Sequence, residues 1–204
     1  MSNVTNIKAK TFVPQAASTT SLAAAQQTAG AQDLVLTGTA VNDGSNMQTS
    51  VTLTSAGNLS GVAFAIEGTD SNGAIVNEAG LTGPNNNTVT SARAYLTVTK
   101  ISVNGAVGTN VSAGFVATNT GQGIIFAGRT KIRGLQGYSD NAAGNIEFTN
   151  GSQSGTPNLL IYTGAADYDL EPYIPDNGVL FPDGAYLDMQ STQVCEGLTV
   201  FFDG

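Results

Sequence analysis

The sequence predicts an all-β protein with two small antiparallel β-sandwich or barrel-like domains, preceded by an extended N-terminal arm. Apolar and polar residues alternate with the period of two that strands require, as in Val51 and Leu53 against Thr52 and Thr54. Turn-forming stretches such as NDGSN, TDSNG, TGPNNN and VNGA interrupt these runs at intervals of about 8 to 14 residues, a spacing typical of sandwiches and barrels. A chain of 204 residues is long enough for one good core or two small ones.

Changes in composition suggest the domain boundaries. Residues 1–32 contain VPQAASTTSLAAAQQTAGAQ, a low-complexity stretch with too few large apolar residues to fold alone. This arm is expected to be either a disordered tail or a segment that orders on a partner, and Ala23–Gln27 could form a short helix capped by Ser21. Residues 33–120 are expected to form an Ig-like β-sandwich. After a flexible glycine joint, residues 124–204 are expected to form an acidic C-terminal β domain.

Charge is unevenly distributed along the chain. Five acidic and all seven basic residues lie at or before Arg133, whereas residues 134–204 carry ten acidic residues and no basic one. Such an acidic block repels phosphates and anionic membranes, so neither nucleic acid nor a membrane is an expected partner. Arg129, Lys131 and Arg133 alternate onto one strand face. That face is either solvated or a docking stripe for an acidic surface, such as the C-terminal half of a neighbouring copy.

Composition also limits the possible chemistry. The chain has no histidine and a single cysteine, Cys195, which excludes Ser-His-Asp and Cys-His catalysis and leaves no Cys/His cluster for zinc. No phosphate loop, dinucleotide fingerprint or nucleophile elbow is present. We therefore expect no catalytic residue, no cofactor and no enzymatic activity. The chain also lacks a signal-like or membrane-spanning apolar run, so a soluble, unsecreted protein is expected.

The stretch FAIEGTDSNGAIVNEAG, residues 64–80, admits three interpretations. Asp70 and Asn72 are placed as in the start of a calcium loop, but the later oxygen ligands are missing. Glu67 and Glu78 could form an acid/base pair only if one carboxyl were buried, yet both lie beside small or polar residues at strand ends. A β-hairpin with a polar tip needs only the residues present and is the favoured interpretation.

A second acidic segment, TGAADYDLEPYIPDNG, contains alternating carboxylates at Asp167, Asp169 and Glu171. In an extended strand all three face one side, which suits a solvated face, a divalent cation or a basic partner. The prolines that follow break the region into short apolar pieces typical of a subunit interface. Together with the arm and the basic stripe, the residues expected at interfaces are Phe12, Val13, Arg129, Lys131, Arg133, Tyr173, Ile174 and Phe181.

Residues 50–115, SVTLTSAGNLSGVAFAIEGTDSNGAIVNEAGLTGPNNNTVTSARAYLTVTKISVNGAVGTNVSAGF, resemble a module common in tailed-bacteriophage virion proteins. In that family a strand with a TSAGNLSG turn leads to a GTDxNG hairpin, and a TGPNxxTV turn and a VTxIxVNGA strand follow. The ending GVLFPDGAYLDMQSTQVCEGLTVFFDG is similar to the β-structured C-terminal ends of small structural proteins in marine and cyanobacterial podophage-like viruses.

This resemblance implies a virion structural protein made in the host cytoplasm. The leading hypothesis is a decoration or cement protein on the outer capsid surface, bridging major capsid protein subunits as a homotrimer at local threefold positions. The alternative is a tail, neck or fibre-attachment adaptor. A glycan-binding or depolymerising enzyme lacks support, because aromatic residues make up only 7% of the chain and no carboxylate pair with a buried acid emerges.

Overall fold

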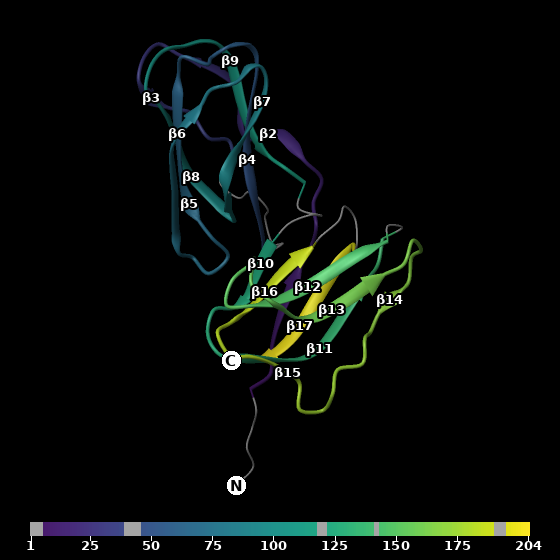
Figure 1. The fold of residues 1–204 in the computed structure, drawn as a ribbon. Helices are drawn as coiled ribbons and strands as arrows, with labels where there is room; N and C mark the ends of the chain where they lie inside the picture. Colours follow the sequence, from purple (N-terminus) through teal and green to yellow (C-terminus); the bar gives the residue numbers. More distant parts are fainter. Residues whose placement is uncertain (1–5, 39–45, 118–121, 141–142, 190–194) are drawn as a thin grey trace. The chain divides into compact units, whose positions relative to one another are not determined.

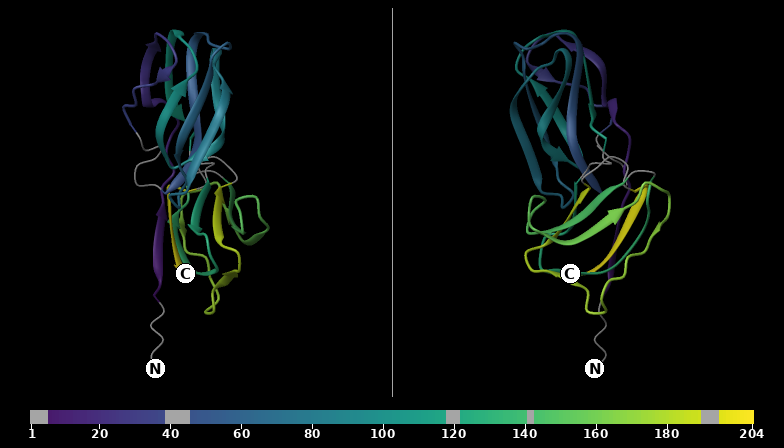
Figure 2. Two further views of the ribbon diagram at one scale, coloured as in Figure 1. Left: turned by 90° about the vertical axis from the view of Figure 1, so that its left-hand side faces the viewer. Right: turned by 45° about the vertical axis from the view of Figure 1, so that its right-hand side comes forward.

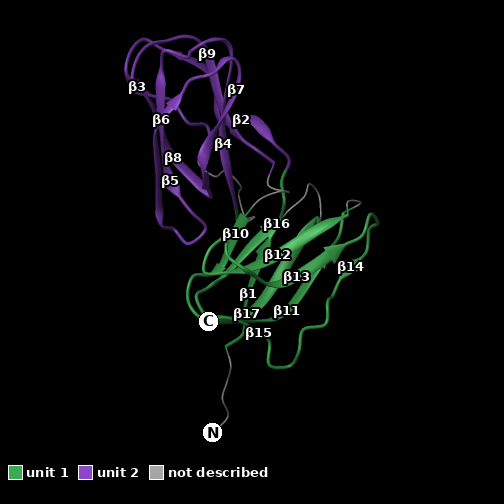
Figure 3. Cartoon of the chain, in the orientation of Figure 1, with its two compact units in different colours: residues 1–15, 44–47, 119–204 green, residues 16–43, 48–118 purple. Residues whose placement is uncertain are grey.

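The computed structural model describes residues 6–38, 46–117, 122–140, 143–189 and 195–204, and these residues form strands and loops without a helix. The predicted all-β class is therefore confirmed. The chain divides into two compact units, shown in green and purple in Figure 3. Unit 1 comprises Met1–Gln15, Gly44–Met47 and Asn119–Gly204, and unit 2 comprises Ala16–Asp43 and Gln48–Thr118.

Unit 2 is a sandwich of antiparallel strands (Figure 1). One layer has the order β2 (Ser18–Thr28), β9 (Val107–Phe115), β4 (Met47–Asn58) and β7 (Asn85–Tyr95). The other layer has the order β3 (Gln32–Asp33), β8 (Thr97–Val103), β5 (Ala63–Thr69) and β6 (Ile75–Thr82). Both layers contribute apolar side chains to one core, among them Leu53, Phe64, Ile101 and Val111.

The period-two pattern of the sequence explains these strands. On β5, Phe64 and Ile66 are buried in the core, whereas Ala65 and Glu67 between and after them point away from it. The pairing of β5 with the adjoining strand β6 shifts register between Phe64 and Ile66. Its Gly80 has a φ of 78°, a left-handed conformation that glycine adopts without steric cost.

Unit 1 is a second two-layered antiparallel structure (Figure 2). In one layer β17 (Gly197–Asp203) lies between β1 (Lys8–Phe12) and β11 (Thr130–Tyr138), and β11 also pairs with the short strands β14 (Asp169–Leu170) and β15 (Val179–Phe181). The other layer has the order β13 (Pro157–Thr163), β12 (Gly144–Asn150), β16 (Ala185–Met189) and β10 (Gln122–Phe126). Phe12, Ile132, Phe148, Leu187 and Val200 belong to the core between them.

The first part of the expected arm is instead a strand of unit 1. Lys8 pairs with Phe202 and Phe12 with Leu198, so β1 forms an edge of the layer. The Phe12 side chain is fully buried. Burial of an aromatic side chain, together with a backbone ladder, gives this segment a stable place within the same chain.

The second part of the expected arm is strand β2 of unit 2, so Ala23–Gln27 is extended rather than helical. Leu22 and Ala23 are fully buried in the core of unit 2. The backbones approach closely here, because the carbonyl of Ser18 occupies the space that a Cβ atom on Gly114 would need. The small side chains that make the segment look unstructured therefore permit this close packing.

The fold also changes the distribution of charge. Unit 1 includes the N-terminal lysines and has five basic and ten acidic residues, a formal net charge of −5. Unit 2 has two basic and five acidic residues, a formal net charge of −3. The negative charge of the C-terminal half is thus partly balanced, because β1 brings Lys8 and Lys10 to it.

Replacing Phe12 with alanine tests whether the N-terminal residues are part of the fold. We expect the free energy of unfolding of unit 1 to fall by about 3–5 kcal/mol, because a buried aromatic side chain is replaced by a cavity. The matched control is Val13→Ala, at a neighbouring side chain that is 38% exposed, with an expected change within about 0.5 kcal/mol. Urea denaturation followed by circular dichroism measures both, and equal values for the two variants would contradict the placement of β1.

Candidate interaction site

The stretch of residues 64–80 forms the hairpin between β5 and β6, which confirms the favoured interpretation. Asp70 Oδ1 accepts hydrogen bonds from the backbone N–H groups of Asn72 and Ala74, at 2.8 and 2.9 Å. Gly73 has a φ of 79°, and its N–H donates to the Asp70 carbonyl at 3.0 Å. The Asp70 carboxylate therefore stabilises a tight turn through local backbone donors.

Glu67 and Glu78 do not form a carboxylate pair, because they lie on opposite faces of their layer. Glu78 is opposite Ile66, a core residue, and Glu67 is the next residue along β5. The Glu67 carboxylate lies 3.4 Å from Lys100 Nζ, which is also 3.9 Å from Asp33 Oδ1.

Glu78 instead joins the edges of the two layers of unit 2. Its two carboxylate oxygens accept hydrogen bonds from the backbone N–H groups of Ala92 at 3.0 Å and Arg93 at 2.9 Å, both on β7. Both donors lie between Thr90 and Ala94, where the ladder between β7 and β4 shifts register. The Glu78 carboxylate thus supplies acceptors to two backbone donors that this irregularity takes out of the ladder.

The three alternating carboxylates lie at one end of unit 1. Asp167, Asp169 and Glu171 are exposed, and Asp169 on β14 pairs with Tyr138 at the end of β11. Among the residues that the structure describes, no group of three or more acidic or cysteine side chains is arranged to hold a metal ion. The structure thus does not bring these three carboxylates together as a cation site.

Two of these carboxylates instead surround a tyrosine. The pKa of the Tyr138 hydroxyl is raised by loss of solvent and then by the negative charges of Asp167, Glu196 and Asp169. The Glu196 N–H donates to the Tyr138 carbonyl at 2.9 Å. We call Tyr138, Asp167, Asp169 and Glu196 the acidic end of unit 1.

The three basic residues of the predicted stripe have different surroundings. Arg133 is bound within unit 1, because its Nε lies 2.6 Å from Asp203 Oδ2 and its Nη1 donates to the Asp176 carbonyl at 2.9 Å. Arg129 is exposed just before β11, and Lys131 on β11 is half-buried. Of the three, Arg129 and Lys131 border a hollow of about 310 Å³, which we call the basic hollow. Its lining residues are Arg129, Thr130, Lys131, Leu180, Asp203 and Gly204.

The other predicted interface residues differ in how exposed they are. Phe12 and Phe181 are fully buried in the core of unit 1, so their prediction as interface residues is wrong. Ile174 is partly buried against the same core. Tyr173 is 84% exposed and remains available to a partner, as does Val13. An apolar residue in a short isolated strand gives no periodic signal of the face on which it lies.

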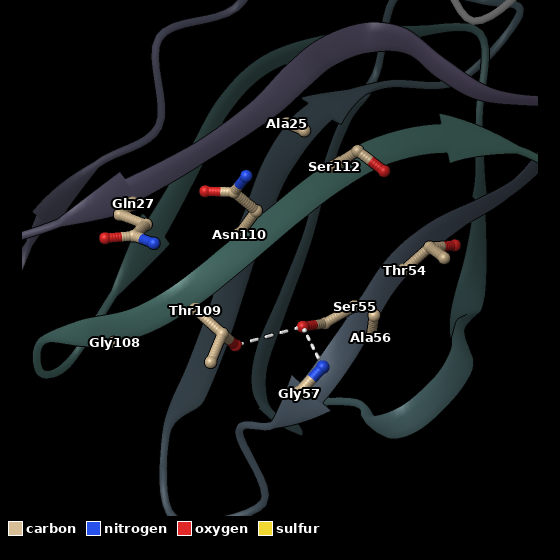
Figure 4. A pocket seen from close by; sticks show the side chains of 10 residues that line it. All are labelled: Ala25, Gln27, Thr54, Ser55, Ala56, Gly57, Gly108, Thr109, Asn110 and Ser112. Atoms are coloured by element: carbon tan, nitrogen blue, oxygen red, sulfur yellow. Dashed lines mark hydrogen bonds between the residues drawn. The ribbon is translucent and has the colours of Figure 1, made fainter.

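Unit 2 carries a hollow of about 520 Å³ that the sequence did not reveal (Figure 4). It lies on the outer face of β2, β4 and β9 and is lined only by alanine, glycine, serine, threonine, asparagine and glutamine. Within it the Ser55 hydroxyl lies 3.2 Å from the Thr109 hydroxyl and accepts the Gly57 N–H at 3.1 Å. The lining offers hydrogen bonds but no titratable side chain. The only sequence signal is the run of small polar residues on alternate positions of β4 and β9.

Searches against protein-family models, curated proteins and solved structures found no match to this chain. The described residues contain no helix with the length and apolar character needed to cross a membrane.

Cys195 is a core residue rather than an accessible nucleophile. It is buried in unit 1, with its Sγ 3.9 Å from Met189 Sδ. Burial, with a smaller contribution from the charge of Asp140, raises the pKa of its thiol to about 12. The thiolate, which is the reactive form, is therefore strongly disfavoured near neutral pH.

We predict that Glu78→Ala lowers the free energy of unfolding of unit 2 by about 1–3 kcal/mol, because two backbone donors lose a charged acceptor. Glu67→Ala is the control, since it removes only an exposed ion pair, with an expected loss of about 0–1 kcal/mol. Thermal and urea denaturation of both variants tests the difference. Equal stability of Glu78→Ala and the wild type would show that the carboxylate does not stabilise this part of β7.

The pKa of Cys195 predicts a pH dependence of stability. Above its usual pKa of 9.0 the unfolded thiol ionises while the folded thiol keeps its proton until about pH 12. The unfolded state then binds fewer protons, so the stability of unit 1 falls as the pH rises through this window. We expect Cys195→Ala to remove about 2 kcal/mol of the stability loss between pH 8 and pH 10.5, as measured by urea denaturation. An identical pH profile in the variant would contradict a buried, protonated thiol.

Proposed function

We propose that this chain is a non-enzymatic virion structural protein, a decoration or cement protein that stabilises a tailed-bacteriophage capsid by bridging major capsid protein subunits. The observation that carries the proposal is the order of strands and turns in residues 50–115, the segment that resembles the virion module.

The four sequence stretches that carry the resemblance lie at successive strand ends and turns of unit 2. The TSAGNLSG stretch ends β4 and leads to β5, and the GTDSNG stretch is the tip of the β5–β6 hairpin. The TGPNNN stretch joins β6 to β7, and the VNGA stretch joins β8 to β9. All four stretches that carry the resemblance thus lie where strands of this chain end or turn, as a conserved strand-and-turn order would require.

The use of the acidic side chains also supports a structural role. Asp70 caps a turn, Glu78 accepts hydrogen bonds from the backbone of β7, and Asp203 binds Arg133. These carboxylates are engaged in holding the fold, whereas a hydrolase needs a carboxyl with a raised pKa aimed at a substrate cleft. The exposed charge of unit 1 suits attachment to a protein surface instead.

The test is to add purified protein to capsids that lack it and to measure bound copies per particle. A cement protein at local threefold positions should bind in hundreds of copies and raise the temperature at which the capsid ruptures, because each copy links neighbouring subunits. Saturation at about a dozen copies would identify the tail or neck adaptor instead, since such positions follow the symmetry of the tail. Failure to bind any part of the particle would overturn both.

A further inference from the structure

The layer β1–β17–β11 of unit 1 has basic residues at one end. The register places Lys8 opposite Phe202, and Lys131 is opposite Asp203. Lys8, Lys131 and the preceding Arg129 therefore lie near the same end of the layer. The three strands are green in Figure 3, and β15 pairs with β11.

The opposite end of the same layer is acidic. Tyr138, the last residue of β11, pairs with Gly197 on one side and with Asp169 on the other. The Ser139 N–H donates to the Tyr168 carbonyl at 2.9 Å, which holds the Asp167 segment against this end. Asp167, Asp169 and Glu196 are all exposed there.

The two ends are too far apart to neutralise one another within one molecule. Lys131 and Tyr138 are seven residues apart on β11, roughly 23 Å along a strand that rises about 3.3 Å per residue. Salt screens exposed charges beyond about 8 Å under physiological conditions. The charges of the two ends therefore act separately on an approaching molecule, and at the basic end Arg133 offsets the charge of Asp203.

We propose that copies of this chain associate head to tail through unit 1, with the acidic end of one copy docked on the basic hollow of the next. This inference rests on the proposed function and names the contact by which the copies would assemble. Two residues of the hollow, Arg129 and Lys131, bind the carboxylates of Asp167 and Asp169 of the next copy.

Among the described basic residues of unit 1, Arg129 and Lys131 are the ones left for a partner. The Lys8 Nζ already donates to the Gly204 carbonyl at 2.6 Å, and Lys10 Nζ donates to the Ile124 carbonyl at 2.6 Å. Arg133 is held by Asp203. Within the described part of the chain, the side chains of Arg129 and Lys131 form no ion pair, and both border the hollow.

The acidic end also carries the aromatic side chains that protein interfaces favour. Tyr138 is 40% exposed and Tyr168 is 37% exposed beside the carboxylates. Tyrosine and arginine are enriched in interfaces, and a guanidinium can stack on a tyrosine ring while it binds a neighbouring carboxylate. The contact thus combines apolar area with opposite charge. A surface with charge alone would bind a second copy less well.

Head-to-tail contacts join two different surfaces, and they close into a ring when the rotation between copies allows it. A ring of three is the closed form expected from the proposed trimer. Several partly buried charge pairs around such a ring would set the orientation of docking.

Sedimentation velocity of the full chain at low and high salt tests the proposal. We expect the wild type to form an oligomer that dissociates as salt rises, because the contact depends on charge. Lys131→Glu and Asp169→Lys should each weaken association by about tenfold or more, since each places like charges together. The matched control is Glu147→Lys, which changes the net charge as Asp169→Lys does but lies on β12 of the other layer, and it should associate as the wild type does.

Mixing the two weakened variants provides a test that does not depend on the stability of either alone. In the mixture the unaltered hollow of the Asp169→Lys variant meets the unaltered acidic end of the Lys131→Glu variant, so the two variants should pair at low salt. A ring of three cannot alternate two variants, so a one-to-one pair is the expected product rather than the trimer. A monomeric wild type at low salt, unchanged association of both variants, or no recovery on mixing would overturn the proposal. Capsid binding by a chain that stays monomeric would reject this contact while leaving the proposed function intact, and association of the chain without capsid binding would do the reverse.

Discussion

The backbone pairing of β1 with β17 is the interaction on which unit 1 depends. It joins residues near the two ends of the sequence, Lys8 with Phe202 and Phe12 with Leu198, and it places β17 between two neighbouring strands. Phe12 enters the core at the same point, so the ladder and the apolar core are formed together. The chain then continues into unit 2 as β2, which means that a segment with few large apolar residues supplies a strand to each unit.

The same pairing determines the electrostatics of unit 1. It brings Lys8 and Lys10 to a unit that otherwise has three basic and ten acidic residues. Lys8 lies 5.2 Å from the centre of the Phe126 ring and Lys10 lies 5.8 Å from that of Phe12, so their stems cover aromatic surface at the edge of the sandwich. Lysines at an edge strand also discourage pairing with other chains. Association through the ends of the layer is compatible with this protection, because it leaves the strand edge unpaired.

The carboxylates of this chain stabilise different parts of the fold. Asp70 binds local backbone donors, Glu78 binds donors on a neighbouring strand, and Asp203 binds the guanidinium of Arg133. In each case the negative charge accepts hydrogen bonds from donors of the same unit. The remaining acidic residues stay on the surface, where Asp167, Asp169 and Glu196 are gathered by the end of β11.

The sequence by itself determined the strands and the β5–β6 hairpin, because alternation and turn residues act over a few neighbouring positions. Asp70 and Gly73 carry that turn within five residues, so no distant partner is needed. Only the tertiary structure decided that β1 and β2 belong to the two units, since their partners are distant in sequence, β1 is short, and the mostly small side chains of β2 show no clear period. It also decided that Phe12 and Phe181 are core residues, and that Arg133 binds Asp203 seventy residues away while Lys131 faces the basic hollow. Pairings of this kind depend on which strands become neighbours, and a local pattern carries no information about that choice.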